Sequence, residues 1–365
     1  MKRILYTLFA AFALCFMFVG CESKKEVEEE RIEIGVILPT EDEPRWQQDK
    51  AQFEKLFASE SLNGKIVFSN GQTEREKENV DMLIEKGAKV IIICPTDAEE
   101  AKNSIESAKL NGVKIICYDR LILNSDCVDY YVSFNSVEVG EKQASYLVDN
   151  RPAGVKSPLY IYTGASSDNN SFSFFEGAWN VLEPYLESGD FEIANSEKAK
   201  KYIGKKELTK EEMAEIISET TTNWDESVAR NLARSNLASS TLKGNVCILA
   251  PNDPTARAIA DTFSQDQNVT SYVITGQDAE LTSIKYIIKG RQNMTVFKNT
   301  STLAFDTVSM AKDIIKGGYV PTDAIYENGI KEVPGISTPV TVITKDNYYV
   351  ELISSGYYQD EQVRD

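Results

Sequence analysis

The sequence predicts an α/β protein built from two doubly wound lobes, each containing a parallel sheet. Short apolar runs alternate with amphipathic segments along the chain from residue 31 onward. The apolar runs are nearly continuous in Val and Ile, which is typical of parallel strands that helices cover on both faces. Roughly 335 residues take part in this alternation. A single hydrophobic core rarely supports so many residues, so two lobes are expected.

The first lobe is predicted at residues 31–134, with a return of the chain to it at about 300–335. Its expected helices carry apolar residues on one face, as at Val80, Leu83 and Ile84, and glycines such as Gly87 and Gly112 end them. Strands are expected at 32–38, 65–69, 89–94, 113–119 and 130–136, and helices at 45–61, 74–87 and 97–112.

The second lobe is predicted at residues 135–299 together with about 336–365. The alternation restarts there, with strands expected around 158–164, 245–253, 271–278 and 294–299. The stretch 195–222 is rich in Lys and Glu. It is interpreted as an insertion or as one long surface helix, without a chemical role.

The N-terminus has the pattern of an export signal. Lys2 and Arg3 precede an apolar run at residues 4–20, and Cys21 follows it directly. The sequence FVGC resembles a bacterial lipobox, so we expect a lipoprotein signal peptide at residues 1–20, a lipidated Cys21 and a charged tether at 21–30. An ordinary signal peptide or an uncleaved membrane anchor is the alternative. The predicted location is the outer side of the cell membrane or the periplasm, with the lipid as the membrane contact.

The charge of the chain excludes several classes of partner. With 56 acidic and 39 basic side chains the net charge is −17, and it becomes about −19 without residues 1–20. Such a surface repels nucleic acid, so no nucleic-acid partner is expected. The chain has no histidine, the commonest general base and metal ligand, and it lacks the D-x-[DN]-x-[DN]-G calcium loop. No metal, no cofactor and no enzyme activity are predicted.

Besides Cys15 in the signal region and Cys21, the expected lipidation site, the chain has four cysteines, and none of them has C-x-x-C spacing. Cys94 and Cys117 end apolar strands, where cysteine packs as a small hydrophobe. Free buried thiols are therefore predicted, with a disulfide between Cys117 and Cys127 as the alternative.

Polar and aromatic side chains follow the predicted strands at equivalent points. In open parallel sheets, ligands bind beyond the carboxyl ends of the strands. The residues at these strand ends are Arg45, Trp46, Asp119, Arg120, Asp168, Asn169, Asn170, Asn252, Asp253, Gln277, Asp278 and Lys298. Trp224 joins this set, although it lies just before a later helix.

This set of side chains suits a neutral polyol. Carboxylates accept hydrogen bonds from sugar hydroxyls, while Arg, Lys and amide groups donate to sugar oxygens. An indole offers a flat apolar wall for the C–H face of a pyranose, the role expected of Trp46 beside the donor Arg45.

Each residue taken alone also has a purely structural interpretation. A strand-end Asp is often a helix N-cap, as Asp253 would be with Pro254 in the first helical position. A single Trp is more often part of a core. Helix caps alone do not explain six such positions at equivalent strand ends, which favours a shared ligand site.

Several motifs resemble one family of binding proteins. RWQQD, CYDR, SFNSVEVGEKQASYLV, SSDNN, PNDPTA, TGQDAELTSIKYIIKGRQNMTVFK and STPVTVITKDN are similar to the xylose-binding and multiple-sugar-binding periplasmic proteins. The resemblance covers about Ile32 to Gly356, except 195–222. It implies the type I periplasmic-binding-protein fold, with two lobes joined by a hinge of several strands, and closure of the lobes around the ligand.

The resemblance also implies a role for particular residues and partners. Arg45, Trp46, Asp119, Arg120, Asn170, Trp224, Asn252, Asp278 and Lys298 match sugar-contacting positions of the family. The implied function is that of a monomeric sugar-binding lipoprotein that serves the permease and ATPase of an ABC importer. Xylose is the first expectation and glucose or galactose the second, because Ala165, Ser166 and Pro251 depart from the usual residues beside the pocket.

Other functions compete with transport. A glycosidase needs one carboxyl group with a raised pKa and one ionised partner, whereas Arg120 and Lys298 beside Asp119 and Asp278 would keep both ionised. A transcription regulator would need a helix-turn-helix and a basic face. A sensory role with a chemoreceptor or sensor kinase stays open. The tyrosine pairs at 348–349 and 357–358 are interpreted as strand packing, with an aromatic carbohydrate-binding patch as the alternative.

Overall fold

A computed structural model describes residues 31–152 and 154–364. From Ile32 onward the chain forms one compact unit. The predicted signal peptide at 1–20, the lipidated Cys21 and the tether at 21–30 lie outside the described residues. Within the described part of the chain, every helix is too short or too polar to cross a membrane.

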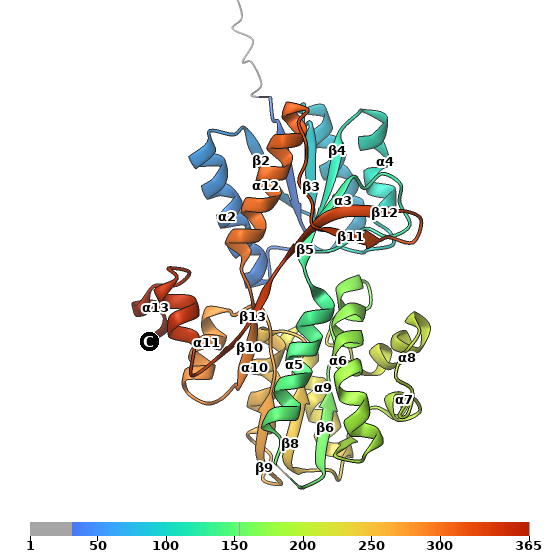
Figure 1. The fold of residues 1–365 in the computed structure, drawn as a ribbon, viewed down its shortest axis with the longest axis vertical. Coiled ribbons are helices and arrows are strands. Elements are labelled where there is room, and N and C mark those ends of the chain that lie inside the picture. Colours follow the sequence, from blue (N-terminus) through green and yellow to red (C-terminus); the bar gives the residue numbers. More distant parts are fainter. Residues whose placement is uncertain (1–30, 153, 365) are drawn as a thin grey trace, which may run out of the picture. The chain divides into compact units, whose positions relative to one another are not determined.

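The first lobe is built on a seven-stranded sheet with the order β11-β12-β5-β4-β3-β1-β2 (Figure 1). All neighbouring strands are parallel except β11 and β12, which form an antiparallel pair. Apolar clusters pack on both faces of this sheet, because helices cover both. The strands are β1 (Ile34–Leu38), β2 (Gly64–Phe68), β3 (Val90–Ile93), β4 (Lys114–Tyr118), β5 (Tyr130–Phe134), β11 (Ala324–Glu327) and β12 (Glu332–Thr338), and the helices are α2 (Pro44–Glu60), α3 (Thr73–Glu85), α4 (Lys102–Leu110) and α12 (Thr300–Lys316).

The second lobe has a four-stranded parallel sheet with the order β7-β6-β8-β9, again with an apolar cluster on each face. Its strands are β6 (Ser157–Ile161), β7 (Phe191–Ile193), β8 (Gly244–Leu249) and β9 (Val269–Ile274). Its helices are α5 (Ser136–Asn150), α6 (Asn169–Glu187), α7 (Glu197–Lys200), α8 (Lys210–Thr220), α9 (Glu226–Ser239), α10 (Asp253–Phe263) and α11 (Leu281–Ile288). The prediction of two doubly wound lobes is confirmed.

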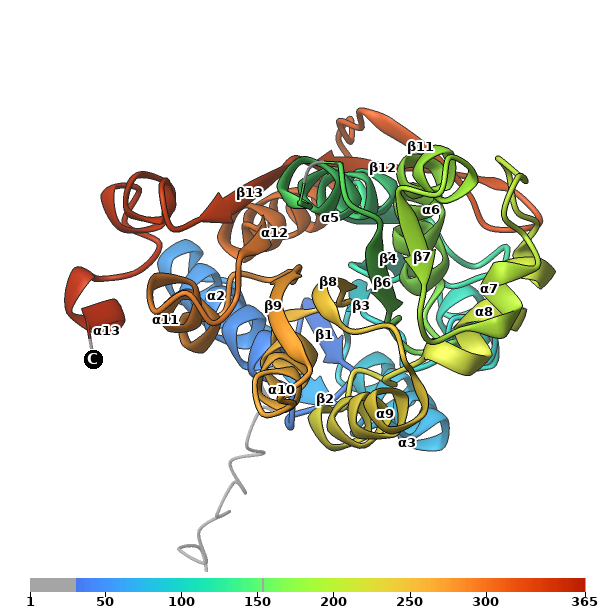
Figure 2. The ribbon, with the colours of Figure 1, turned by 90° about the horizontal axis from the view of Figure 1, so that it is seen from below.

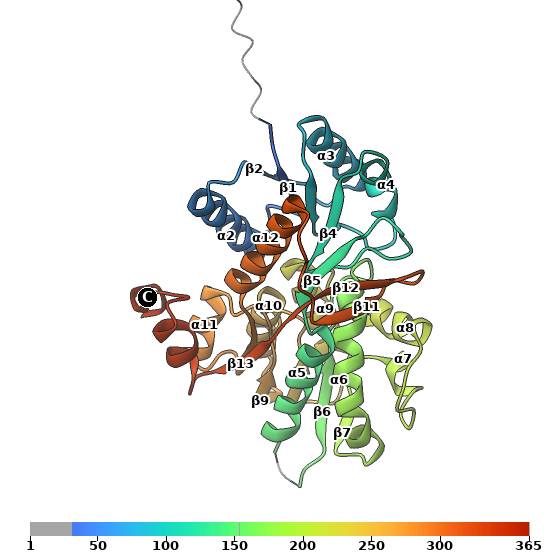
Figure 3. The ribbon, with the colours of Figure 1, turned by 45° about the horizontal axis from the view of Figure 1, so that its top comes forward.

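Three segments connect the lobes, as Figure 3 shows. The chain passes from β5 to α5, from β10 (Met294–Lys298) to α12, and from β12 to β13 (Val340–Thr344). β12 pairs with β5 in the first lobe, whereas β13 pairs antiparallel with β10. The structure thus contains the hinge of several strands that the resemblance implied.

Three local predictions differ from the structure. The stretch 195–222 forms the two short helices α7 and α8 instead of one long helix, because Gly204 interrupts it in a left-handed conformation with φ of 89°. Asn252, and not Asp253, caps α10. The tyrosine pairs lie in a C-terminal tail with the π-helical turn η1 (Tyr349–Ser354) and α13 (Asp360–Arg364), outside any strand. Cys94, Cys117, Cys127 and Cys247 are free thiols, and all except Cys127 are buried.

Two glycines allow α5 and α6 to pack with their backbones in contact. A Cβ atom on Gly140 would lie 1.9 Å from the carbonyl oxygen of Phe174, and one on Gly177 would lie 2.0 Å from that of Val137. No side chain can adjust to relieve contacts with backbone atoms. The position of α6, which begins at the ligand cavity described below, therefore depends on both glycines.

Gly140→Ala is expected to destabilise the protein by about 1–3 kcal/mol, because α5 and α6 must separate to accept the methyl group. The free energy of unfolding in urea measures this effect. Gly318→Ala is the control, since its methyl group would meet Asp313 at an ordinary 3.7 Å. Equal stability of the two variants would show that the helix contact has no such energetic weight.

Candidate ligand-binding site

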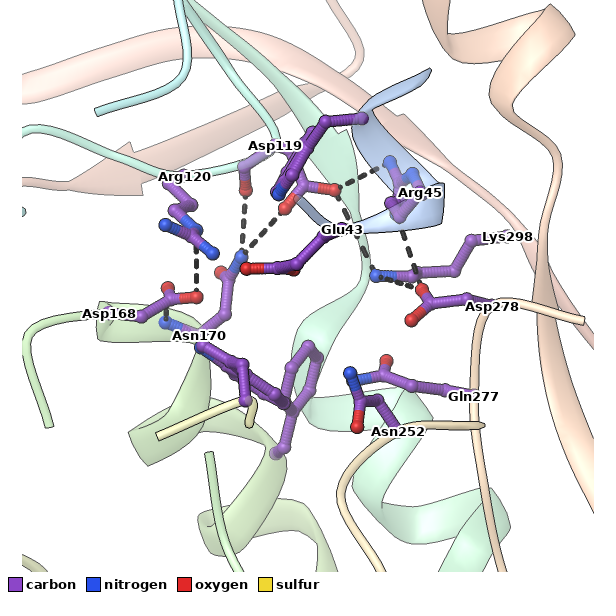
Figure 4. Close-up of a pocket in the computed structure, with 13 residues that line it drawn as sticks. Glu43, Arg45, Asp119, Arg120, Asp168, Asn170, Asn252, Gln277, Asp278 and Lys298 are labelled. Carbon is purple, nitrogen blue, oxygen red and sulfur yellow. Dashed lines mark hydrogen bonds and ion pairs between the residues drawn. The ribbon is translucent and has the colours of Figure 1, made fainter. Parts of the chain in front are cut away.

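A cavity with about 320 Å³ of empty space, part of it reaching solvent, lies between the lobes at the carboxyl ends of their strands (Figure 4). All nine residues predicted from the sequence as ligand contacts line it. Four further residues complete the wall: Glu43, Asp168, Phe174 and Gln277. Asp168 and Gln277 belong to the strand-end residues predicted from the sequence, whereas Glu43 and Phe174 are not among them.

Arg45 is the centre of a charged network. Its Nε donates to Asp49 at 2.7 Å, one terminal nitrogen donates to Asp119 at 3.0 Å, and the other donates to Asp278 at 3.3 Å. Lys298 adds a second cation, with its Nζ 2.9 Å from Asp278 and 3.9 Å from Asp119. Asp278 belongs to the second lobe and Asp119 to the first, so the network joins the lobes.

These contacts keep Asp119 ionised. Burial alone would raise the pKa of Asp119, but Lys298, Arg45 and Arg120 outweigh burial and lower it. The sequence had assigned the balancing charges to Arg120 and Lys298. The structure adds Arg45 as the cation in direct contact with both carboxylates, while Arg120 acts on Asp119 from farther away and makes its own ion pair with Asp168 at 2.9 Å.

A second connection between the lobes runs through the start of α6. Asp168 caps this helix, and its carboxylate accepts from the backbone N–H of Asn170 at 2.9 Å. The side-chain amide of Asn170 donates to the carbonyl of Asp119 at 2.9 Å and to its carboxylate at 3.3 Å. Asp168 and Asn170 therefore hold Arg120 and Asp119 across the cleft.

The two tryptophans of the wall differ in their surroundings. Trp46 is 3% exposed, and the guanidinium carbons of Arg45 and Arg120 each lie 5.2 Å from its ring centroid. It is thus both part of the core and a support for the two arginines. Trp224 meets Phe174 edge-on, with ring centroids 6.4 Å apart. Its indole N–H is buried and has no hydrogen-bond partner among the described residues, so it can donate to a ligand.

The backbone is strained at three of the wall residues. Asp119, Trp224 and Asp278 have backbone φ angles of 61°, 62° and 96°, values that residues other than glycine rarely adopt. Gly164 makes room for the indole, because a Cβ there would lie 2.1 Å from the ring of Trp224. Such strain persists only where surrounding contacts enforce it, and it clusters at functional sites.

Asn252 presents its amide group to the cavity because its oxygen is used elsewhere. The side-chain oxygen accepts from the backbone N–H of Thr255 at 3.3 Å and from its hydroxyl at 2.6 Å, which caps α10. Figure 4 shows the nitrogen directed toward the cavity. Below it, buried Asp253 accepts from the backbone N–H of Glu280 at 2.8 Å and from Gln292 at 2.7 Å, so it holds the loop that carries Asp278.

Comparison with known proteins identifies the family. Residues 34–318 match the periplasmic binding protein domain. The chain belongs to the periplasmic binding protein family. It is 30% identical to the multiple sugar-binding periplasmic protein SbpA of Azospirillum brasilense, over 98% of each chain. It is 29% identical to the D-xylose-binding periplasmic protein of Escherichia coli, over 99% of each chain.

A solved structure supports the same assignment. It is that of a carbohydrate transporter solute binding protein from Chloroflexus aurantiacus in complex with D-glucose. This protein is 50% identical to the present chain, with a TM-score of 0.89, and the match covers 91% of this chain and 98% of that chain. The type I fold implied by the sequence motifs is thereby confirmed.

Both unexpected wall residues of this periplasmic binding protein had a weak signal in the sequence. Phe174 follows Asn170 by one helical turn and therefore lies on the same face of α6. Glu43 directly precedes α2 in the sequence EPRW. Burial raises the pKa of Glu43, Arg120 opposes this effect, and Asp278 and Asp168 add to it.

A buried carboxyl group supports the loop beneath Arg120. Glu76 is fully buried, and one of its oxygens accepts from the backbone N–H of Thr96 at 2.8 Å. The neighbouring carbonyl of Pro95 accepts from Arg120 at 3.4 Å. Burial raises the pKa of Glu76 to about 7, above the value of about 4.3 for an exposed Glu.

The stability of the protein should therefore depend on pH through Glu76. The folded state holds the proton more tightly than the unfolded state, so this stabilisation is complete below about pH 4 and is lost as the pH rises through about 7. We expect Glu76 to contribute a fall of about 1–3 kcal/mol in the free energy of unfolding between pH 5.5 and 8, beside the fall from buried Glu280, whose pKa burial also raises to about 7. Glu76→Gln should reduce this fall, whereas Glu78→Gln, at an exposed position of α3, should not. Parallel pH profiles of the wild type and Glu76→Gln would contradict the prediction.

Proposed function

We propose that this protein binds a monosaccharide in its pyranose form outside the cytoplasm and delivers it to a sugar ABC importer. The observation that carries the proposal is the cavity itself, where charged donors and acceptors from both lobes meet two indole rings. Each sugar hydroxyl both donates and accepts a hydrogen bond, which an alternation of carboxylates and cations satisfies. The relatives named above are sugar-binding proteins, which favours the same ligand class here.

The balance of charge favours a neutral ligand. Three cations line the cavity, and four carboxylates face them: Glu43, Asp119, Asp168 and Asp278. A neutral sugar leaves this balance intact. An anionic sugar would add a further unpaired negative charge to a buried site, which is costly.

Glucose is the sugar we now place first and xylose second. The motifs alone favoured xylose, whereas the relative at 50% identity holds D-glucose. The two sugars differ by one CH₂OH group, and a pocket rejects such a group only by crowding. Both are therefore expected to bind, with glucose the tighter.

Thermal shift with a panel of sugars tests the ligand class. A sugar at 100 times its Kd should stabilise the protein by about 2.7 kcal/mol, which is visible as a raised Tm. Glucose, xylose and galactose form the neutral set, and glucuronate and maltose are the controls for charge and size. A shift with none of the neutral monosaccharides would refute the proposal, and a shift with glucuronate alone would refute the charge argument.

Removal of one side chain from the network should weaken sugar binding. Asp119→Ala removes one of the two carboxylates that Arg45 and Lys298 share, and Arg120→Ala removes the cation paired with Asp168. Each should raise the Kd roughly tenfold to several hundredfold, measured by calorimetry. Asp126→Ala, at an exposed ion pair of the first lobe, is the control and should bind normally. Unchanged affinity in both cavity variants would remove these residues from the site.

Binding without catalysis is the proposed mode of action. A glycosidase would need one protonated carboxyl group next to the bond that breaks. Asp119 and Asp278 share the cations Arg45 and Lys298. Burial raises the pKa of Glu43, but the relatives named above are sugar-binding proteins, which favours binding here. Export by the signal peptide, anchoring through Cys21 and docking on a permease with its ATPase belong to the same proposal. Docking on a chemoreceptor or sensor kinase is its alternative outcome, and pull-down from membranes with and without sugar distinguishes the two.

A further inference from the structure

The C-terminal tail is attached to the second lobe at the edge of the cleft. η1 and α13 follow β13, and Figure 2 shows them beside α11. Leu352, Tyr358 and Val363 pack with Ile284 and Ile287 of α11 in one buried cluster. The tail therefore moves with the second lobe when the lobes separate.

One hydroxyl group of this tail contacts both lobes. The hydroxyl of Tyr358 donates to the carbonyl of Ala279 at 3.0 Å and accepts from the side-chain amide of Gln48 at 3.2 Å. Ala279 directly follows Asp278 in the strained loop, whereas Gln48 lies on α2, the helix that carries Arg45. Tyr358 does not line the cavity, so it touches the supports of the ligand contacts and not the ligand itself.

The preceding tyrosine reinforces this arrangement. The ring of Tyr357 meets Phe297 edge-on, with centroids 4.6 Å apart, and its hydroxyl lies 3.1 Å from that of Thr300. These two contacts flank Lys298 in the sequence. The tail thus supports the segments that carry Lys298 and Asp278 from outside the cavity.

We propose that Tyr358 is a positioning residue, whose hydrogen bond to Gln48 stabilises the closed arrangement of the lobes. This inference rests on the proposed function, in which the lobes close around a sugar. The bond from Gln48 to Tyr358 breaks when the lobes separate, whereas the bond to Ala279 lies within the second lobe and persists. We call the hydrogen bond between Gln48 and Tyr358 the clasp. Because the clasp does not touch the ligand, it favours the closed state equally for every sugar.

Another contact between the lobes lies at the opposite edge of the cleft. The backbone N–H of Ala98 in the first lobe donates to the carbonyl of Ser167 in the second at 3.0 Å. Backbone groups form this bond, so no substitution of a side chain removes it directly. Side chains outside the cavity also meet across the lobes in the exposed ion pair of Lys210 with Glu99 at 3.5 Å and in the contact between the hydroxyls of Tyr357 and Thr300. The Tyr358–Gln48 bond differs from these because the same hydroxyl also binds the loop next to Asp278.

Tyr358→Phe tests the proposal, because it keeps the buried ring and removes only the hydroxyl. We expect the rate of sugar release to rise about three- to tenfold in stopped-flow measurements, with the same factor for glucose and xylose. Gln48→Met should raise the release rate by a similar or smaller factor. The double variant should release sugar no faster than Tyr358→Phe alone, because both substitutions remove the same bond. Tyr349→Phe, on an exposed tyrosine of the same tail, is the matched control.

A distance measurement that needs no sugar accompanies the kinetics. Spin labels at Lys55→Cys on α2 and Thr282→Cys on α11, in a Cys127→Ser background, report the separation of the lobes. Tyr358→Phe should shift the distance distribution toward longer values. If no sugar binds the wild type, the proposed function fails and this distribution alone decides on the clasp.

Two results would overturn the inference. The first is that Tyr358→Phe leaves both the release rate and the distance distribution unchanged. The second is that its effect on release differs between glucose and xylose, which would make Tyr358 a determinant of specificity and not of closure. In the first case, a changed melting temperature would assign the hydroxyl to stability alone.

Discussion

The arrangement of the cleft depends on one buried cation. Arg45 is 4% exposed and binds three carboxylates, two from its own lobe and Asp278 from the other. A buried charge without partners is strongly unfavourable, so the guanidinium requires Asp49 and Asp119 to stay in place. Asp49 is itself fixed by the hydroxyl of Tyr118, which donates to it at 2.6 Å. The first lobe therefore presents a preorganised set of charges, and Asp278 completes it when the second lobe approaches.

Polar contacts join the lobes at the cavity, beside the apolar contacts of Phe174 and Trp224 in the cluster that also contains Trp46. Arg45, Arg120 and Asn170 all bond to partners across the cleft. Water can replace such contacts when the lobes separate, whereas an exposed apolar interface would remain costly. This difference makes reopening feasible, and a sugar that supplies hydrogen bonds to both lobes shifts the balance toward closure.

The strain in the cavity wall is balanced by contacts behind it. Asp278 has a left-handed backbone, and the loop around it is held by Asp253 below and by the hydroxyl of Tyr358 at the side. Trp224 is likewise left-handed and fits only because Gly164 lacks a side chain. These supports hold the ligand contacts in one geometry before a ligand arrives, which reduces the entropy lost on binding.

The amino-acid sequence by itself determined the two lobes and the strand ends where polar residues gather, because alternating apolar periods and the residues that end them are local properties. All nine residues expected at the site line one cavity. Only the tertiary structure decided which charges pair. Arg45 and Asp278 are 233 positions apart, and Arg120 prefers Asp168 over the carboxylates that the sequence had suggested. The same holds for Tyr358, since the way in which a tail packs across two lobes depends on distances that no local pattern encodes.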